Sequence, residues 1–179
     1  MSNFFETNDY KMPVTSNYMK FKEGVNTFRV LSSAIVGYEY FNNDNKPVRS
    51  RHEFDETPGI KAGGEVKHFW AFVVWNYADE KIQILELTQK GIMTYMQSLI
   101  NNKKWGNPTG YDLVVTRTGV GMNTEYSCMS EPHSPLEAKI AEAWSKSKVN
   151  LAALYEGQDP FKVTSNDTGE ADIEDIPFN

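Results

Sequence analysis

VKHFWAFVVWNY, residues 66–77, is the stretch that decides the fold. It is rich in β-branched and aromatic residues, which favour strands, and it contains neither proline nor glycine. Trp70 and Phe72 would share one face of such a strand, with Phe69, Trp75 and Tyr77 on the other. Because both faces are apolar in the middle, the stretch predicts a central strand that is covered on both sides.

The neighbouring sequence predicts further strands in pairs. A turn at 78–80 leads into a second β-prone run at 81–87, so the two are expected to form a hairpin. Two more pairs of short runs are separated by few residues, and we expect hairpins there too, 27–31 with 35–41 and 112–118 with 124–129.

Three segments carry helical signals. Residues 90–101 place apolar side chains at intervals of three and four, which predicts an amphipathic helix. Residues 134–137, Ser-Pro-Leu-Glu, form a capping box that would start a second helix. A shorter helix is expected from Asn150 to Tyr155, ended by Gly157 and Pro160.

Together these elements predict a mainly β domain over residues 1–162, followed by a disordered acidic tail at 163–179. The favoured architecture is a barrel of five or six strands of the oligonucleotide-binding (OB) type, with one inserted helix and C-terminal helices. A sandwich or an open α+β sheet fits the same order of elements. Residues 42–65 form a long polar loop, and loops of this length are functional or disordered.

Charge is distributed unevenly along the chain. The net charge is −6, yet all 18 lysines and arginines lie at or before Lys162. The tail carries −5, which leaves the remainder at −1. A nearly neutral body can still present a local basic groove, so the acidic composition does not argue against nucleic acid.

Several classes of protein receive no support from the sequence. The lone Cys128 forms no internal disulfide and is expected to be a small buried thiol, as in a reducing cytosol. The first residues lack the features of a signal peptide, and no apolar run is long enough to cross a membrane, so a cytoplasmic location is expected. Phosphate-loop, dinucleotide-binding and nucleophile-elbow motifs are absent, and His52, His68 and His133 lack metal-ligand spacing. We therefore expect no enzyme activity, cofactor or metal.

The last residues carry a family resemblance. An acidic run closes on apolar residues, DIEDIPF at 172–178, with Asn179 after it. This segment resembles the C-terminal tip of bacterial single-stranded DNA-binding proteins and their bacteriophage counterparts, in which Phe is the last residue. The stretches at 69–76 and 154–161 also look like phage members of that family. The resemblance implies a tail that recruits replication or repair proteins and competes with DNA, using Asp172, Glu174, Asp175, Ile176, Pro177 and Phe178.

Binding of single-stranded DNA without sequence preference is the function that these features predict, in replication, recombination or repair in a bacterial host cytoplasm. A single strand needs cations for phosphates and flat aromatic side chains for bases. The candidate cations are Lys46, Arg49, Arg51, Lys61, Lys67 and Arg117, and the candidate aromatic residues are Tyr38, Tyr40, Trp70, Phe72 and Trp75. A metal-dependent nucleic-acid enzyme and a tail-mediated interaction protein are the alternatives. The sequence leaves the oligomeric state and the choice between DNA and RNA open.

Overall fold

A computed structural model describes residue 12 and residues 16–162 of the chain. In this part, seven antiparallel strands form one open sheet in the order β3-β2-β4-β1-β6-β7, with β5 paired to β4. The strands are β1 (Gly24–Val30), β2 (Ile35–Phe41), β3 (Pro47–Ser50), β4 (Lys67–Asn76), β5 (Lys81–Leu87), β6 (Tyr111–Thr118) and β7 (Glu125–His133). The prediction of a mainly β fold is confirmed.

β4 is the central strand, as the sequence predicted. β5 pairs with residues 70–76 along one edge. The other edge is shared by β2, which pairs with residues 67–71, and β1, which pairs with residues 74–76. The predicted hairpin between 27–31 and 35–41 is therefore wrong. The link between the two strands stays beside β4, because the Leu31 N–H donates to the Val73 carbonyl and the Val73 N–H donates to the Ser32 hydroxyl.

The sheet does not close into a complete ring of strands. Among the described residues, no ladder joins β5 to β7. The edge of β5 instead meets residues 17–19, where the Ile84 N–H donates to the Asn17 carbonyl and the Met19 N–H donates to the Ile84 carbonyl, each at 2.9 Å. The segment before β1 thus takes a position next to β5 inside the fold.

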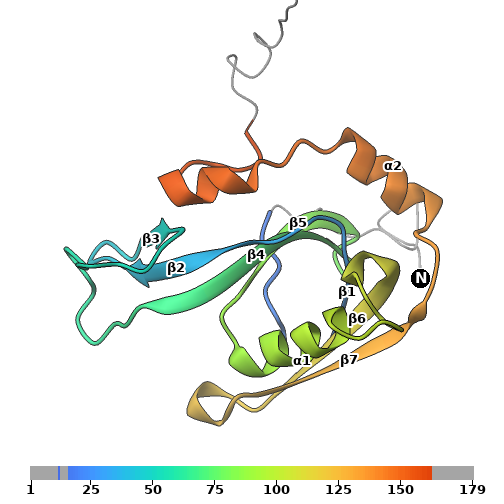
Figure 1. Ribbon diagram of the computed structural model, residues 1–179, viewed down its shortest axis with the longest axis horizontal. Coiled ribbons are helices and arrows are strands. Elements are labelled where there is room, and N and C mark those ends of the chain that lie inside the picture. The colour runs from blue at the N-terminus through green and yellow to red at the C-terminus, as the bar shows by residue number, and fades with distance from the viewer. Residues whose placement is uncertain (1–11, 13–15, 163–179) are drawn as a thin grey trace, which may run out of the picture.

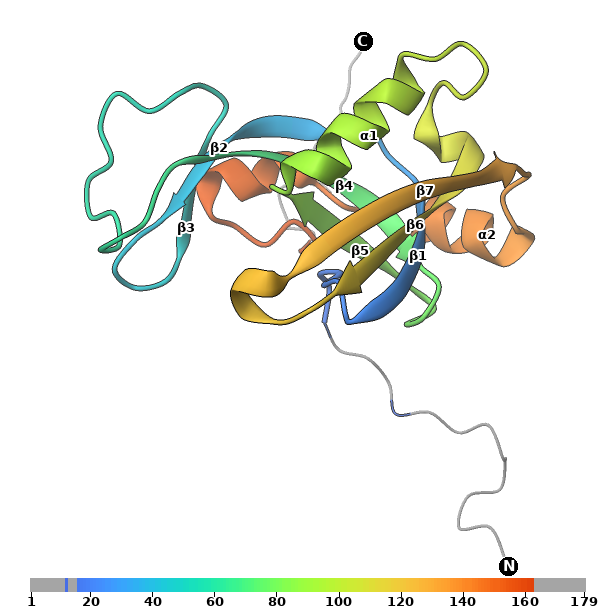
Figure 2. The same cartoon turned by 90° about the horizontal axis from the view of Figure 1, so that it is seen from below.

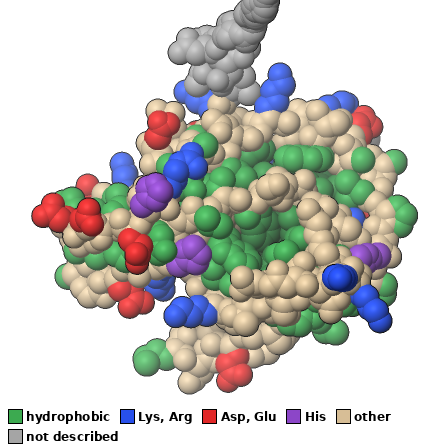
Figure 3. Space-filling model, viewed as in Figure 1, with side chains coloured by type: hydrophobic (Ala, Val, Ile, Leu, Met, Phe, Trp, Pro, Cys, Tyr) green, Lys and Arg blue, Asp and Glu red, His purple; other side chains and the backbone are tan. Residues whose placement is uncertain are grey.

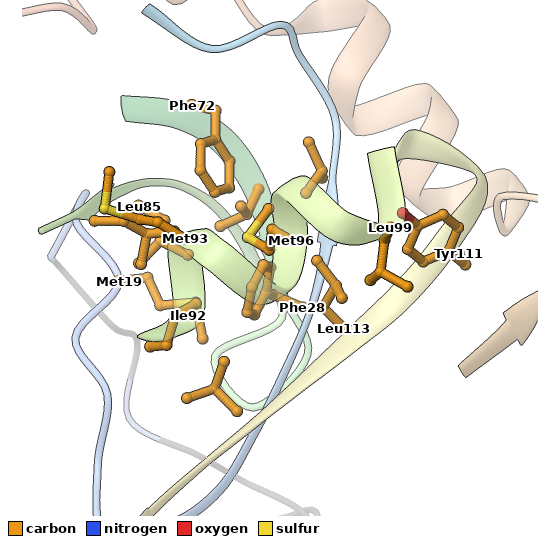
Figure 4. Close-up of a cluster of buried hydrophobic side chains, with 14 residues drawn as sticks. Met19, Phe28, Phe72, Leu85, Ile92, Met93, Met96, Leu99, Tyr111 and Leu113 are labelled. Atoms are coloured by element: carbon orange, nitrogen blue, oxygen red, sulfur yellow. The ribbon is translucent and has the colours of Figure 1, made fainter. Parts of the chain in front are cut away.

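The largest core lies between the sheet and α1 (Lys90–Ile100), whose predicted position is confirmed. Figure 4 shows side chains from α1, such as Met96, meeting Phe28 of β1, Phe72 of β4 and Leu113 of β6. Met19 also enters this cluster, so the segment before β1 contributes to the core.

The opposite face of the sheet is covered by the C-terminal part of the described chain. α2 (Ala138–Lys146) and the 3-10 helix η3 (Leu151–Glu156) lie across it, on the other side from α1 (Figure 1). Ile140 of α2 packs on Val73 and Trp75, and Leu154 of η3 packs on Phe69. No helix in the described residues is long and apolar enough to span a membrane.

Two local predictions are corrected. α2 begins at Ala138, after the expected capping box, and Glu137 at its N-cap makes no side-chain cap hydrogen bond. The Ser134 hydroxyl instead accepts a 2.7 Å hydrogen bond from Arg29. The side chain that the capping box would use at the helix N-terminus is therefore engaged in a tertiary contact. The loop predicted at 42–65 contains β3, which pairs with β2 through Val48 and its neighbours.

Candidate nucleic-acid interface

A groove lies between two hairpins. Both hairpins project toward the same side of the molecule (Figures 1 and 2). One is the β2–β3 hairpin and the other is the β6–β7 hairpin. The groove has a volume of about 830 Å³, and residues 18–21 and β5 contribute to its lining. Its charged and aromatic lining residues are Tyr18, Lys20, Phe21, Phe41, Lys46, Arg49, Glu86, Arg117 and Tyr126.

Three cations in this groove are not neutralised by a described carboxylate. Lys20 and Lys46 are exposed, and neither forms a salt bridge within residues 16–162. Arg117 donates from one terminal nitrogen to the Phe21 carbonyl at 3.1 Å, while its Nε is buried without a hydrogen-bond partner in the described residues. These side chains come from three separate segments and give the groove a local positive charge.

Arg49 lies in the same groove, but two carboxylates already hold it. Its Nε is 3.1 Å from Glu39 Oε1 and its terminal nitrogen is 2.8 Å from Glu86 Oε2. Burial, with the negative charge of Glu86 next in importance, raises the pKa of Glu39 to about 7, and Arg49 opposes that rise. The guanidinium of Arg49 is therefore a poor phosphate contact in this conformation, because its charge is already neutralised by Glu39 and Glu86.

Aromatic side chains accompany the cations. Phe41 is 45% exposed at the end of β2, and Tyr126 is 36% exposed on β7. Phe21 packs between the core and the surface, with its ring centroid 6.3 Å from that of Phe28 and 5.9 Å from that of Tyr126. Phe41 and Tyr126 thus offer flat surfaces on the two hairpins that flank the groove.

Three of the predicted stacking residues, Tyr40, Phe72 and Trp75, are buried and do not line the groove. Tyr40 is 2% exposed, donates its hydroxyl to the Pro58 carbonyl and packs against Phe54. Phe72 belongs to the core under α1, and Trp75 to the core under α2. These large aromatic side chains on the inner strands are used for packing, which disfavours their predicted stacking role.

Tyr38 and Trp70 retain partial exposure, but they lie on the other face of the sheet. The register pairs Tyr38 with His68 and Val36 with Trp70, so these four side chains share a face. Tyr38 packs against His68 with ring centroids 5.2 Å apart. The groove residues Phe41 and Arg49 occupy the alternate positions of β2 and β3, so the groove does not include this pair.

The remaining predicted cations lie on or beside the segment between β3 and β4. That segment is attached to the β2–β3 hairpin, because the Lys61 N–H donates to the Phe41 carbonyl at 2.8 Å and the Asn43 N–H to the Gly59 carbonyl at 3.0 Å. Lys61 Nζ donates to Asn45, Arg51 lies 4.2 Å from the ring centroid of Tyr155, and Lys67 is exposed. Arg51 is thus engaged outside the groove, and Lys61 and Lys67 line a neighbouring hollow.

Sequence reasoning missed the groove residues Tyr18, Lys20, Phe21, Phe41 and Tyr126. For the first three a signal was present, since residues 18–22 read YMKFK and interleave aromatic with basic side chains. Nothing local distinguished Phe41 or Tyr126 from core residues of their strands. Their exposure depends on the ends and edges of the sheet, which only the tertiary fold defines.

The predicted partner-binding residues of the tail, 172–178, lie outside the described residues. Within the described part of the chain, no group of three or more His, Cys, Asp or Glu is placed to hold a metal ion. Comparisons with protein-family models, curated proteins and solved structures gave no match.

Proposed function

We propose that this protein binds single-stranded DNA without sequence preference in the groove between the β2–β3 and β6–β7 hairpins. The observation that carries the proposal is the joint presence of Lys20, Lys46 and Arg117 with the exposed rings of Phe41 and Tyr126. A single strand offers both a charged backbone and unstacked bases, and cations combined with aromatic surfaces suit both. Hydrogen bonds to base edges are not required, so sequence preference is expected to be weak.

The strand connectivity supports an OB-type assignment. In this assignment β1 and β2 together are the first strand of that fold, and β4, β5, β6 and β7 are the second to the fifth. α1 then falls between the third and the fourth strand. OB folds bind oligonucleotides on the face of strands two and three, between the loop joining strands one and two and the loop joining strands four and five. The groove occupies that region, with β5 in the middle and the two hairpins on either side. Residues 17–19 would take part in the closure that β5 and β7 do not make directly.

Binding to oligo(dT), measured by fluorescence anisotropy over a range of salt concentrations, tests the proposal. Lys20→Ala and Lys46→Ala should each reduce the slope of log affinity against log salt by about 1, as expected for one lost phosphate contact. Phe41→Ala and Tyr126→Ala should each weaken binding by roughly 1–3 kcal/mol through lost stacking. Lys148→Ala is the matched control, since Lys148 is exposed and does not line the groove.

The same experiment must also compare single-stranded with double-stranded DNA. Duplex of the same length must bind more weakly than oligo(dT), since paired bases cannot stack on protein side chains. Equal affinity for the duplex, or groove variants that behave like Lys148→Ala, would overturn the proposal. Cleavage of the strand after addition of magnesium would instead favour an enzyme.

The tail is the second part of the proposed function. Its charge of −5 and its resemblance to the tip of single-stranded DNA-binding proteins support a role in competing with DNA and in recruiting replication or repair proteins. A variant truncated after Lys162 should bind oligo(dT) more tightly than the full chain, most clearly at low salt. Unchanged affinity at low salt would contradict the competition.

A further inference from the structure

The neighbouring hollow adjoins the groove at the end of β2. Its volume is about 620 Å³, and β2, β4 and the segment between β3 and β4 supply most of its lining. The side chains that line it are those of Glu39, Phe41, Asn45, Lys61, Glu65, Lys67 and Thr88. Phe41 lines the groove as well, so its exposed ring lies at the boundary between the two spaces.

The groove and the hollow lie on the same face of the sheet. Antiparallel pairing places Glu39 of β2 opposite Arg49 of β3 on one side and opposite Lys67 of β4 on the other. Side chains that are directly opposite each other point to the same face, so these three form one row across the strands. Arg49 lines the groove, whereas Glu39 and Lys67 line the hollow. A strand can therefore pass from the groove to the hollow along one face.

Lysine side chains continue from the groove into the hollow. Lys46 lines the groove, and its neighbour Asn45 accepts a 2.6 Å hydrogen bond from Lys61 Nζ in the hollow. The Lys61 N–H donates to the Phe41 carbonyl at 2.8 Å, which holds this part of the segment beside the end of β2. Lys67 is exposed and forms no salt bridge with a described residue. The three lysines thus follow one another across the boundary that Phe41 marks.

Carboxylates reduce this positive charge without cancelling it. Glu39 is buried and, together with Glu86, already contacts Arg49, so that cluster contributes −1 at the boundary. Glu65 is the one exposed carboxylate in the described lining of the hollow. The other acidic residues of the segment do not line the hollow, and they are Glu53, Asp55 and Glu56. Figure 3 shows acidic side chains gathered at the outer end of this part of the molecule, at the left of the view. Three lysines therefore face two uncompensated negative charges.

We propose that a single strand bound in the groove continues over Phe41 into the hollow, where Lys61 and Lys67 bind its phosphates. The inference rests on the proposed function and extends its site. Phe41 is the one aromatic residue in the described lining of the hollow, so the hollow is expected to bind the charged backbone and not to stack bases. The hollow then adds affinity only for strands that are long enough to pass Phe41.

The dependence of affinity on strand length tests the proposal. Binding of the full-length protein to oligo(dT) of about 4 to 16 nucleotides, the range that OB folds cover, is measured by fluorescence anisotropy at several salt concentrations. The double variant Lys61→Ala/Lys67→Ala should bind the shortest strands nearly as the wild type does. For the longest strands its affinity should fall roughly tenfold or more at low salt, and the slope of log affinity against log salt should decrease by about 1.5, as expected for two lost phosphate contacts.

The matched control for this variant is Lys103→Ala/Lys104→Ala. It removes the same charge from exposed positions that line neither the groove nor the hollow. A general loss of electrostatic attraction would affect both double variants alike, whereas a local contact in the hollow affects only the first.

Glu65→Gln should have the opposite effect. It removes the exposed carboxylate of the hollow, so long strands should bind more tightly at low salt while short strands bind as before. Because a gain of affinity does not arise from misfolding, this variant tests the proposal even if Lys61→Ala/Lys67→Ala fails to fold. Glu56→Gln is its control, since Glu56 is exposed on the same segment but does not line the hollow.

The outcomes separate this inference from the proposed function. If Lys20→Ala and Lys46→Ala weaken binding while Lys61→Ala/Lys67→Ala behaves like its control at every length, the groove stands and the inference is overturned. It is also overturned if the double variant weakens short and long strands equally, or if Glu65→Gln binds long strands no more tightly than Glu56→Gln. If the groove variants also behave like Lys148→Ala, the proposed function fails with it.

Discussion

Two arginines are largely buried in this protein, and their carboxylate partners differ in number. Arg29 is 2% exposed and forms a 2.8 Å salt bridge to Asp112, with its other nitrogens donating to the Thr109 and Ser134 carbonyls and to the Ser134 hydroxyl. Arg49 instead contacts two carboxylates, those of Glu39 and Glu86. The first cluster, Arg29 with Asp112, is balanced because it holds one carboxylate for one guanidinium. The second cluster, Arg49 with Glu39 and Glu86, is unbalanced because it holds one carboxylate in excess.

The difference in partners indicates different roles for the two arginines. Arg29 has a structural role, whereas Arg49 belongs to a site whose charge depends on pH. Arg29 ties β1 to β6 and to the segment before α2, and every nitrogen of its guanidinium has an acceptor. Asp112 also accepts from the Tyr77 hydroxyl, and burial, followed by this hydrogen bond, raises the pKa of Tyr77. Arg49 lies at the groove, where an extra carboxylate would oppose an incoming phosphate.

The largest expected effect comes from breaking the balanced cluster. Arg29→Ala should lower the free energy of unfolding by about 2–4 kcal/mol, because it removes a buried cation and leaves Asp112 without its charge partner. The expected loss of stability is smaller than that for a fully buried ion pair, since the Asp112 side chain is 24% exposed. Urea unfolding at neutral pH measures it, with Lys148→Ala at an exposed position as the control. A loss as small as that of the control would show that the cluster contributes little.

The two arginines also show how far the sequence could predict the site. Arg49 was predicted to contact DNA because it lies among other bases in a polar stretch, yet its partners come from β2 and β5. Glu86 is far away in the sequence, so local patterns could not reveal this pairing. Lys46 and Arg117 were also predicted to contact DNA, and both line the groove. Contact with DNA by either residue stays a prediction.

The fold was predictable to a similar extent. Strong periodic segments such as residues 66–77 and 90–101 became β4 and α1, because their apolar patterns agree with the burial that the fold provides. The pairing of 27–31 with 35–41 was wrong because a short link is compatible both with a hairpin and with two successive strands on one edge. Hydrogen bonds to Val73 select the second arrangement, and they are tertiary contacts.

A smaller effect is expected from the pH dependence of the unbalanced cluster. The folded pKa of Glu39, about 7, lies above its ordinary value of 4.5, so the folded state holds a proton that the unfolded state releases between these values. Stability must then fall as pH rises from about 4.5 to 7. Glu39→Gln should remove this loss and gain about 2 kcal/mol relative to the wild type between pH 5 and pH 8.

Urea unfolding at a series of pH values measures this difference. Glu56→Gln is the control, because Glu56 is exposed on the segment between β3 and β4. The prediction concerns the difference between the two pH profiles, which isolates Glu39 from the other titrating groups. Parallel profiles for Glu39→Gln and the wild type would show that Glu39 has no raised pKa in the folded protein.

The smallest effect comes from making the second cluster resemble the first. Glu86→Gln leaves Arg49 with one carboxylate, so it removes the repulsion that helps raise the pKa of Glu39. The midpoint of the pH-dependent loss of stability should move to lower pH. Stability at pH 8 should change by less than about 1 kcal/mol, since an amide can still accept from Arg49.

Glu86→Gln also removes a negative charge from the groove. Binding of oligo(dT) at low salt should therefore strengthen slightly, in contrast to the weakening expected for Lys46→Ala. An unchanged midpoint would mean that burial alone, without Glu86, sets the protonation of Glu39.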